Sequence, residues 1–200
     1  IFVINEMAHL HGVKANVSVR INPDIDAHTH KYVTTGLYEN KFGISQHEFE
    51  KLLEIIHKSE HINFIGLHFH VGSQITRVDE VFGLECRRVN EIVRYFEDKG
   101  LEIKNINLGG GLGVNYDDPD ANPIADFETW FETIAANIAR RPDQAVHVEP
   151  GRSLVAQCAT LVSRVLFVKS GETKNFLIMD AGMNDLIRPA LYGAYHKIEN

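Results

Sequence analysis

Cysteine is scarce in this sequence, which contains only Cys86 and Cys158. Two isolated thiols form neither a disulfide framework nor a metal-binding motif, and they favour a reducing compartment, so we expect a cytoplasmic protein. Long hydrophobic runs and blocks of like charge are also missing, which argues against a membrane or a nucleic acid as partner. Low-complexity tracts and internal repeats are absent, which excludes a fibrous or repeat architecture.

Start and stop signals are missing as well. The chain opens with IFVINEMAHLHG, typical of the middle of an amphipathic helix, and its end, AYHKIEN, contains no terminating signal. We therefore expect an interior fragment of a longer protein. The composition is that of a globular protein, because 44% of the 200 residues are hydrophobic, 24% are charged and the net charge is −7.

Strand patterns and helix patterns alternate through most of the chain. Short apolar runs rich in β-branched residues predict strands over 16–21, 62–69, 103–108 and 145–149. Helical spacing of apolar residues predicts helices over 46–58, 78–99 and 126–140. The strands start about forty residues apart, as successive β-α units of a parallel sheet do.

Each predicted strand ends directly in a polar or glycine-rich cluster: NPDID, HVGSQ, GGGLG and EPGR in chain order. In β/α barrels the chemistry lies at the carboxyl ends of the strands, whereas an open sheet gathers its ligand contacts at one crevice. Four consecutive clusters favour the barrel. We predict part of a (β/α)8 barrel over 1–157 and, over 158–200, the start of a β-rich domain, because the segment around SGETKN reads as a hairpin.

The stretch HFHVGSQ places His68 and His70 two residues apart, so both side chains can face the same side of a strand. A zinc site is one interpretation, but the neighbouring clusters offer few further ligands. Another interpretation is one core histidine and one surface histidine. The following Gly72-Ser73 favours contact with an anion, because a small turn with a hydroxyl suits one.

The stretch NLGGGLG removes every Cβ from the turn at Gly109, Gly110 and Gly111, so its amides can approach phosphate oxygens. The alternative is a flexible turn. The stretch lacks the lysine of a P-loop, and no helix follows directly, so a single phosphate fits better than a dinucleotide.

Two further stretches carry charged residues. VEPGR places Glu149 at a strand tip and Arg152 after a turn, where the alternative is a surface ion pair. Glu149 follows a short apolar strand, so we expect it to need a partner. Arg188 precedes Pro189 and so is not expected inside a helix. Its neighbourhood, which includes Tyr192, can also be a surface loop.

Taken together, these stretches resemble the pyridoxal-phosphate-dependent decarboxylases of the alanine-racemase-like fold. The matching segments span nearly the whole chain and are VSVRINP, TTG, NKFG, GLHFHVGSQ, NLGGGLG, VEPGRSLV and MNDLIRPALYGAYH. The last segment looks like the branch of the family that acts on diaminopimelate. The resemblance implies the cofactor pyridoxal 5′-phosphate, decarboxylation of meso-diaminopimelate to L-lysine and carbon dioxide, and a homodimer.

The resemblance also implies roles for single residues. It assigns cofactor binding to His70, Ser73, Gly109, Gly110, Gly111, Glu149, Gly151 and Arg152, and substrate binding to Arg152, Arg188 and Tyr192. Arg20 and Lys41 are expected near the site, and His68 is expected to be structural. A carboxylate at Glu149 suits the pyridine nitrogen, because an electron sink there requires that nitrogen to stay protonated. Two arginines suit a substrate with a second carboxylate, which ornithine lacks.

The family's Schiff-base lysine has no convincing counterpart among the ten lysines, because Lys14 and Lys104 lie at the starting ends of strands. The family's late cysteine motif and tyrosine are absent too. We therefore expect no catalytic residue within the chain, no metal and no activity of the chain alone. A decarboxylase for ornithine, arginine or carboxynorspermidine, or a non-catalytic homologue, remains an alternative.

Overall fold

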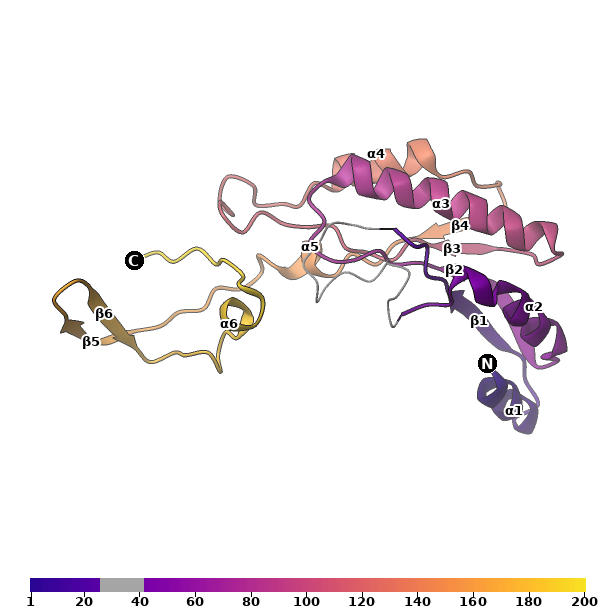
Figure 1. Cartoon of the computed structure of the whole chain (residues 1–200), viewed down its shortest axis with the longest axis horizontal. Coiled ribbons are helices and arrows are strands. Elements are labelled where there is room, and N and C mark those ends of the chain that lie inside the picture. Colours follow the sequence, from indigo (N-terminus) through magenta and orange to yellow (C-terminus); the bar gives the residue numbers. More distant parts are fainter. Residues whose placement is uncertain (26–41) are drawn as a thin grey trace.

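The computed structural model describes residues 1–25 and 42–200 (Figure 1). Four strands form one parallel sheet in the order β1-β2-β3-β4, so each strand lies beside its neighbour in the chain. Their bounds are Ala15–Arg20, Ile62–His68, Asn105–Asn107 and Ala145–His147. Sequential order without a switch point is the order of barrel strands, which confirms the predicted fold class.

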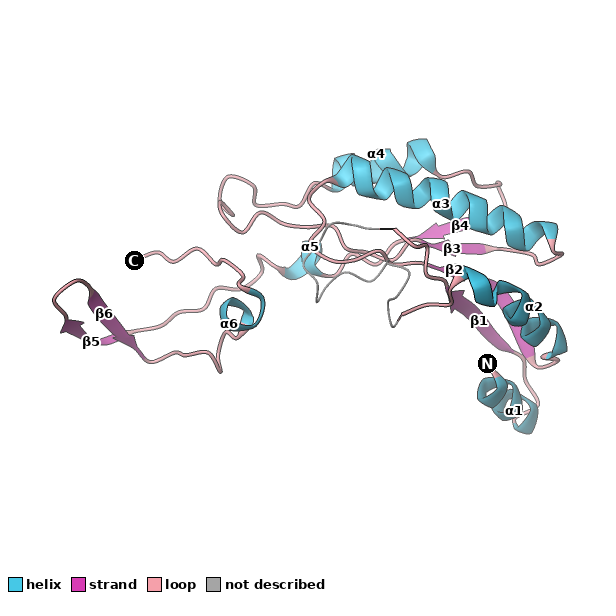
Figure 2. Cartoon of the chain, viewed as in Figure 1, coloured by secondary structure: helices cyan, strands magenta, loops and turns pink. Residues whose placement is uncertain are grey.

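A helix follows each strand of the parallel sheet, and the spacing of apolar residues predicts the first three of these helices (Figure 2). The bounds are Gln46–Glu48 for the 3-10 turn η1, Phe49–Lys58 for α2, Val78–Asp98 for α3, Phe127–Asn137 for α4 and Arg152–Val155 for the short α5. The predicted strand over 103–108 pairs over only three residues, and the predicted helix over 126–140 ends three residues early. The predicted strand over 145–149 likewise ends two residues early, whereas the element types are right.

The core lies between the sheet and helices α2, α3 and α4. Leu67, Phe69, Ile106 and Leu108 are at most 1% exposed and come from alternate positions of β2, β3 and the residues directly after them. Because side chains alternate along a strand, the residues between these positions face the opposite side of the sheet. The apolar residues therefore anchor the helices and leave the other face to polar side chains.

An irregularity interrupts the pairing of β1 with β2. Val17 pairs with Phe64, but the next residue, Ser18, pairs with Gly66, so β2 contains one extra residue at Ile65. Beyond this bulge, Arg20 pairs with His68. The bulge thus decides which side chains of the two strands lie next to each other at the carboxyl ends.

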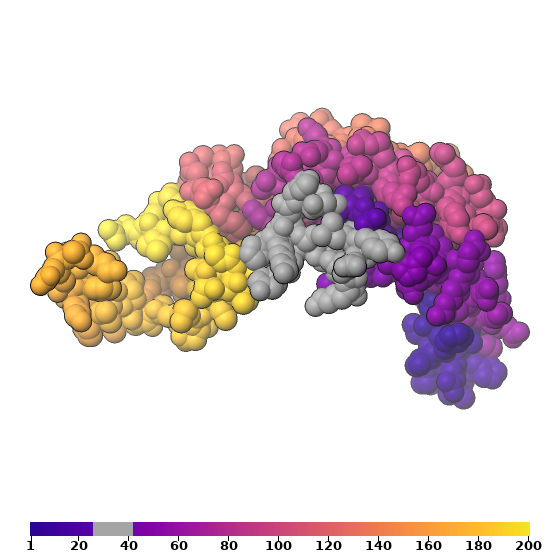
Figure 3. All heavy atoms as spheres, in the orientation of Figure 1, coloured from indigo at the N-terminus to yellow at the C-terminus, as the bar shows by residue number. Residues whose placement is uncertain are grey.

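The segment after α5 forms an antiparallel hairpin of β5 (Val165–Ser170) and β6 (Asn175–Met179), as expected. Every residue of β5 is exposed, and Figure 3 shows the hairpin at the opposite end of the molecule from α1 (Phe2–Leu10). The short helix α6 (Arg188–Tyr192) follows. Its first residue is Arg188 with Pro189 next, so Arg188 is at a helix start and not inside a helix.

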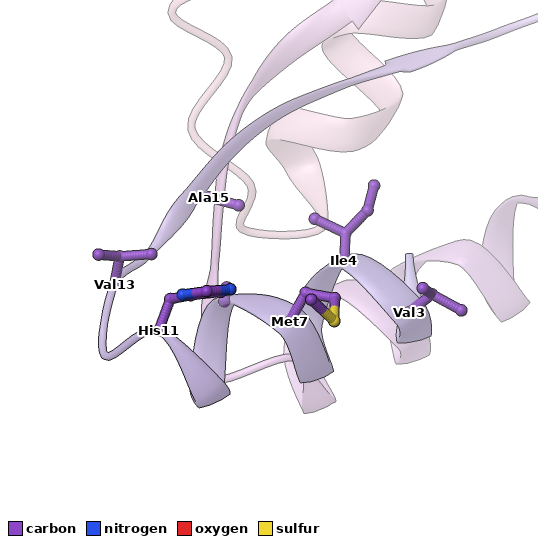
Figure 4. A pocket seen from close by; sticks show the side chains of 7 residues that line it. Val3, Ile4, Met7, His11, Val13 and Ala15 are labelled. Carbon is purple, nitrogen blue, oxygen red and sulfur yellow. The ribbon is translucent and has the colours of Figure 1, made fainter.

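Helix α1 lies beside the starting end of β1, where an apolar hollow opens (Figure 4). The hollow is lined by Val3, Ile4, Met7, Ala8, His11, Val13 and Ala15. Its place at the amino end of the strand separates it from the clusters at the carboxyl ends. Within the described residues, no helix has the length and apolar character needed to cross a membrane.

Candidate active site at the carboxyl ends of the strands

His70 lies just beyond the end of β2 and contacts the glycine turn that follows β3. The Gly110 N–H donates a hydrogen bond to His70 Nδ1 over 3.2 Å, which leaves the ring proton of neutral His70 on Nε2. Burial lowers the pKa of His70, and the charge of Arg20 lowers it further, while Glu149 opposes both. His70 is therefore a neutral imidazole at neutral pH.

The glycine turn is the meeting point of two neighbouring strand ends. A Cβ on Gly109 would lie 2.3 Å from the Phe69 carbonyl oxygen, and one on Gly110 would lie 2.0 Å from the Glu149 carbonyl oxygen. Gly109 also has a φ of +69°, which L side chains rarely adopt. The backbone approach explains why this turn contains only glycine, and it brings the segments after β2 and β4 together.

Glu149 is held at the end of β4 by its backbone and its carboxylate. Its N–H donates to the Gly109 carbonyl over 2.6 Å, and Asn107 Nδ2 donates to Oε1 over 2.7 Å. His68 Nε2 lies 3.6 Å from Oε2, which is too long for a hydrogen bond. The carboxylate side chain is 56% exposed, so the expected cost of burying it does not arise. Glu149 does have a partner in Asn107.

Two of the three amides expected to cradle a phosphate are already hydrogen-bonded within the chain. The Gly109 N–H donates to Asn107 Oδ1 over 2.8 Å, and the Gly110 N–H donates to His70. These bonds order the turn and orient Asn107 and His70. An anion at the turn would meet Gly111 and the turn containing Ser73, because a Cβ on Gly111 would lie 2.3 Å from the Gly72 carbonyl oxygen.

Arg20 ends β1 and faces the same region. Its guanidinium carbon lies 5.0 Å from the centre of the Phe42 ring, and its Nη2 is buried without a hydrogen-bond partner among the described residues. Burial lowers the pKa of Arg20, and Glu149 opposes that shift. The sequence placed Arg20 near the site, and the structure puts it in the electrostatic field of His68, His70 and Glu149.

Arg152 and Arg188 meet at one aromatic ring, that of Tyr116. Arg152 Nη1 lies 3.5 Å from the Tyr116 hydroxyl and 3.4 Å from Gln74 Oε1. The Arg188 guanidinium carbon lies 5.1 Å from the Tyr116 ring centre and 5.8 Å from that of Tyr192. The structure therefore brings together the three residues expected at the substrate.

Ser73 and Gly151 complete the predicted set. Ser73 is partly exposed in the turn after β2, and Gly151 precedes α5 with open space where a Cβ would lie. Ser153 Oγ, in the first turn of α5, is buried without a hydrogen-bond partner in the described part of the chain. Lys41 lies outside the described residues. The described residues contain no group of three His, Cys, Asp or Glu side chains that could hold a metal ion.

Sequence reasoning missed Asn107, Gln74 and Tyr116. Asn107 had a usable signal, because it stands two residues before Gly109 and on the polar face of its strand. Gln74 ends the HVGSQ cluster that was already singled out. Tyr116 had no such signal, because it lies in a loop whose path the sequence does not reveal.

The chain resembles known proteins along nearly its whole length. A family model described as pyridoxal-dependent decarboxylase, pyridoxal binding domain, matches residues 2–156. Diaminopimelate decarboxylase of Bacteroides thetaiotaomicron is 50% identical over 99% of this chain and 51% of its own length. The chain thus spans about half the length of the curated relatives it matches.

Solved structures give the same result. Diaminopimelate decarboxylase from Helicobacter pylori complexed with L-lysine superposes with a TM-score of 0.83 at 36% identity, covering 96% of this chain and 47% of that one. The enzyme from M. jannaschii superposes with a TM-score of 0.84 at 35% identity, covering 98% of this chain and 46% of that one.

Proposed function

This chain belongs to the pyridoxal-dependent decarboxylases, and from that premise we propose that it is part of a diaminopimelate decarboxylase. The proposed enzyme is a carboxy-lyase that converts meso-diaminopimelate to L-lysine and carbon dioxide. We infer that it acts as a cytoplasmic homodimer of about the length of its relatives, and that residues 1–157 and 158–200 belong to its barrel and its β domain.

The convergence of Glu149, His70 and the 109–111 turn carries this proposal. The three come from different strand ends, yet hydrogen bonds join the turn to both residues. An exposed carboxylate, a neutral imidazole and a turn without Cβ atoms are the groups that a protonated pyridine ring with a phosphate requires. The residues therefore fit pyridoxal 5′-phosphate. Ser153, two residues after Gly151, has a buried hydroxyl without a hydrogen-bond partner among the described residues.

Pyridoxal phosphate supplies an electron sink for the electron pair that decarboxylation leaves on Cα. Glu149 would hold the proton on the ring nitrogen by its opposite charge, and the Asn107 amide orients its carboxylate. His70 would lie against the ring face, and its neutral state avoids repulsion with a cationic ring. The remaining proposed cofactor contacts are Ser73, Gly109, Gly110, Gly111, Gly151 and Arg152.

Substrate recognition is assigned to Arg152, Arg188 and Tyr192. Among residues 1–25 and 42–200, neither arginine forms an ion pair with a carboxylate of the chain. Both positive charges are therefore available to a ligand. This supports a substrate with a second carboxylate over ornithine, because an arginine fork binds a carboxylate with two parallel hydrogen bonds.

The test is release of carbon dioxide from meso-diaminopimelate by the protein of full family length that contains this sequence. Glu149→Gln should lower the rate on the order of a hundred-fold, because an opposite charge next to a titrating nitrogen shifts its pKa by one to three units. Glu102→Gln is the matched control, since Glu102 lies before β3, at the other end of the sheet, and forms an ion pair with Lys104.

The outcomes separate the alternatives. Turnover of ornithine, arginine or carboxynorspermidine without turnover of diaminopimelate would move the assignment within the family. Absence of turnover with all four substrates would favour a non-catalytic homologue. An equal loss of activity in Glu149→Gln and Glu102→Gln would contradict the role given to Glu149.

A further inference from the structure

Tyr116 is the central side chain of a cluster drawn from three separate segments. Arg152 from α5 lies with its guanidinium carbon 6.0 Å from the ring centre, and Arg188 from α6 lies 5.1 Å from it. The ring of His196, near the end of the chain, meets Tyr116 edge-on with the two centres 5.2 Å apart. One tyrosine thus contacts both arginines assigned to the substrate.

Tyr116 holds the two arginines in a different way from an aspartate or a glutamate. Two guanidinium groups held near each other repel, and an aspartate or glutamate between them would relieve the repulsion but neutralise part of their charge. An aromatic ring attracts a cation through its quadrupole and carries no net charge. The positive field of Arg152 and Arg188 therefore stays available for an anionic ligand. His196 does not add to the repulsion, because burial and the charge of Arg188 lower its pKa.

The loop that carries Tyr116 is anchored beside Arg152. Gln74 Nε2 donates to the Val114 carbonyl over 2.6 Å, and the Val114 N–H donates to Gln74 Oε1 over 3.3 Å. The same Oε1 lies 3.4 Å from Arg152 Nη1. Gln74 has a φ of +62°, an unusual conformation for a residue other than glycine, which this pair of bonds compensates. Gln74 thus ties the start of the loop to Arg152.

The rest of the loop is attached to the segment after α5 and to the segment after α6. Lys197 pairs with Asp120, and Gln157 Nε2 donates to the carbonyls of Pro119 and Asn122. The chain on both sides of the hairpin is therefore fastened to the loop after the glycine turn. Through these contacts the loop places Arg188 relative to Arg152.

We propose that Tyr116 is a positioning residue that sets the separation of Arg152 and Arg188 and so determines how tightly the site holds the carboxylate of its ligand. The inference rests on the proposed function, because it takes these arginines as the substrate carboxylate site. Tyr116 acts through the arginines and not on the reacting atoms. Its loss should weaken ligands that carry a carboxylate and spare ligands that lack one.

The experiment compares L-lysine with cadaverine, which is lysine without its carboxylate, in the protein of full family length loaded with cofactor. Binding is measured by calorimetry, so the readout does not depend on turnover. Tyr116→Leu should weaken L-lysine at least about ten-fold and leave cadaverine within about two-fold, because two cation–π contacts are removed. Tyr116→Phe keeps the ring, so its affinity for L-lysine should lie between those of the wild type and Tyr116→Leu.

Tyr195→Leu is the matched control, because Tyr195 is 55% exposed in the same terminal segment as His196. It should change neither affinity. If circular dichroism shows that Tyr116→Leu does not fold, Tyr116→Met replaces it, because methionine keeps the bulk of the side chain without its π face. Tyr116→Met should likewise weaken L-lysine and spare cadaverine. The selective loss of lysine affinity supports the proposal.

Three results would overturn the inference: equal weakening of both ligands, unchanged lysine affinity in Tyr116→Leu, or a wild type that binds both ligands equally. Equal weakening would mean that Tyr116 only supports the fold. Failure of the proposed function gives a different result, namely no carbon dioxide from meso-diaminopimelate while lysine and cadaverine still differ in affinity.

Discussion

The four-stranded part of the chain and the β5–β6 hairpin differ in how their apolar residues are used. All buried apolar residues of the described chain lie between Ala8 and Ile134, in and around the parallel sheet. The hairpin has similar β-branched and aromatic residues, but Phe167 is 63% exposed and Leu177 57%. Composition therefore predicts strands in both regions, whereas only the sheet with its helices forms a core.

The two regions are also held together by different forces. The sheet is stabilised by side-chain packing under α2, α3 and α4, and α3 and α4 contact each other through the rings of Phe82 and Trp130, whose centres lie 5.4 Å apart. The hairpin relies on its main-chain pairing and on polar contacts at its open end. A two-stranded hairpin of this kind is marginal by itself. Substitutions should therefore act strongly in the first region and weakly in the second.

The largest effect is expected from Phe96→Ala in α3. Phe96 is fully buried, with the rings of Phe49 and Tyr95 at 4.9 and 5.3 Å, so truncation leaves a cavity. We expect a loss of about 3–5 kcal/mol in the free energy of unfolding, measured by urea titration. Phe167→Ala in the hairpin should change it by no more than about 0.5 kcal/mol. Similar losses of unfolding free energy in both variants would contradict the difference between the sheet region and the hairpin.

The next effect concerns the strand ends. Gly110→Ala should destabilise the fold by about 3 kcal/mol, because its Cβ would lie 2.0 Å from the Glu149 carbonyl and backbone would have to move. Gly151→Ala is the control, since a Cβ there meets no atom within 4 Å. Thermal unfolding of both variants measures the difference. An unchanged melting temperature in Gly110→Ala would show that the turn adapts freely.

A pH-dependent effect is expected from Glu85 in α3, which is fully buried without a hydrogen-bond partner among the described residues. Burial raises the pKa of Glu85 well above its ordinary value of 4.5, so the folded state keeps the proton that the unfolded chain releases. Its contribution is complete below pH 4.5 and is lost as pH rises, with a slope approaching about 1.4 kcal/mol per pH unit.

Glu85→Gln should remove this slope in urea unfolding measured between about pH 5 and about pH 8. Glu50 gives a control of opposite sign, because hydrogen bonds from Tyr95 and Lys99 lower its pKa. Its contribution is present above its ordinary pKa of 4.5 and is lost as pH falls, so Glu50→Gln should lower stability above that pH and remove the pH slope only on the acid side. A wild type whose stability does not fall with rising pH relative to Glu85→Gln would contradict the buried, protonated state.

The smallest effect is expected in the hairpin. Asp180 Oδ1 accepts hydrogen bonds from Ser163 Oγ over 2.9 Å and from the Arg164 N–H over 2.8 Å. Asp180→Ala should speed hydrogen exchange at the Arg164 amide, because that donor then faces water. The Leu67 amide in the core should keep its rate, as the two regions open independently. Slower or equal exchange at Arg164 would contradict this.

The sequence predicted the parallel order, the helices and the hairpin because the periodicity of apolar residues is a local signal. It brought His70, Glu149 and the glycine turn into one region because strand ends of a parallel sheet share an edge. Glu85 shows the limit of such patterns, since a carboxylate on the buried stripe of α3 contradicts the rule that charges lie outside. Tyr116 shows another limit, because its contacts come from residues 36 and more positions away.

The extra residue at Ile65 has a consequence for how this protein tolerates change in its length. Because Val17 pairs with Phe64 and Ser18 with Gly66, a chain without Ile65 would keep all of these pairs, and Arg20 would still stand beside His68. The side chains beyond the bulge would stay on their own sides of the pleat, with Phe69 in the core. Deleting the Ile65 codon should therefore be tolerated, whereas deleting one residue of β3, which pairs on both sides without an extra residue, should shift its register.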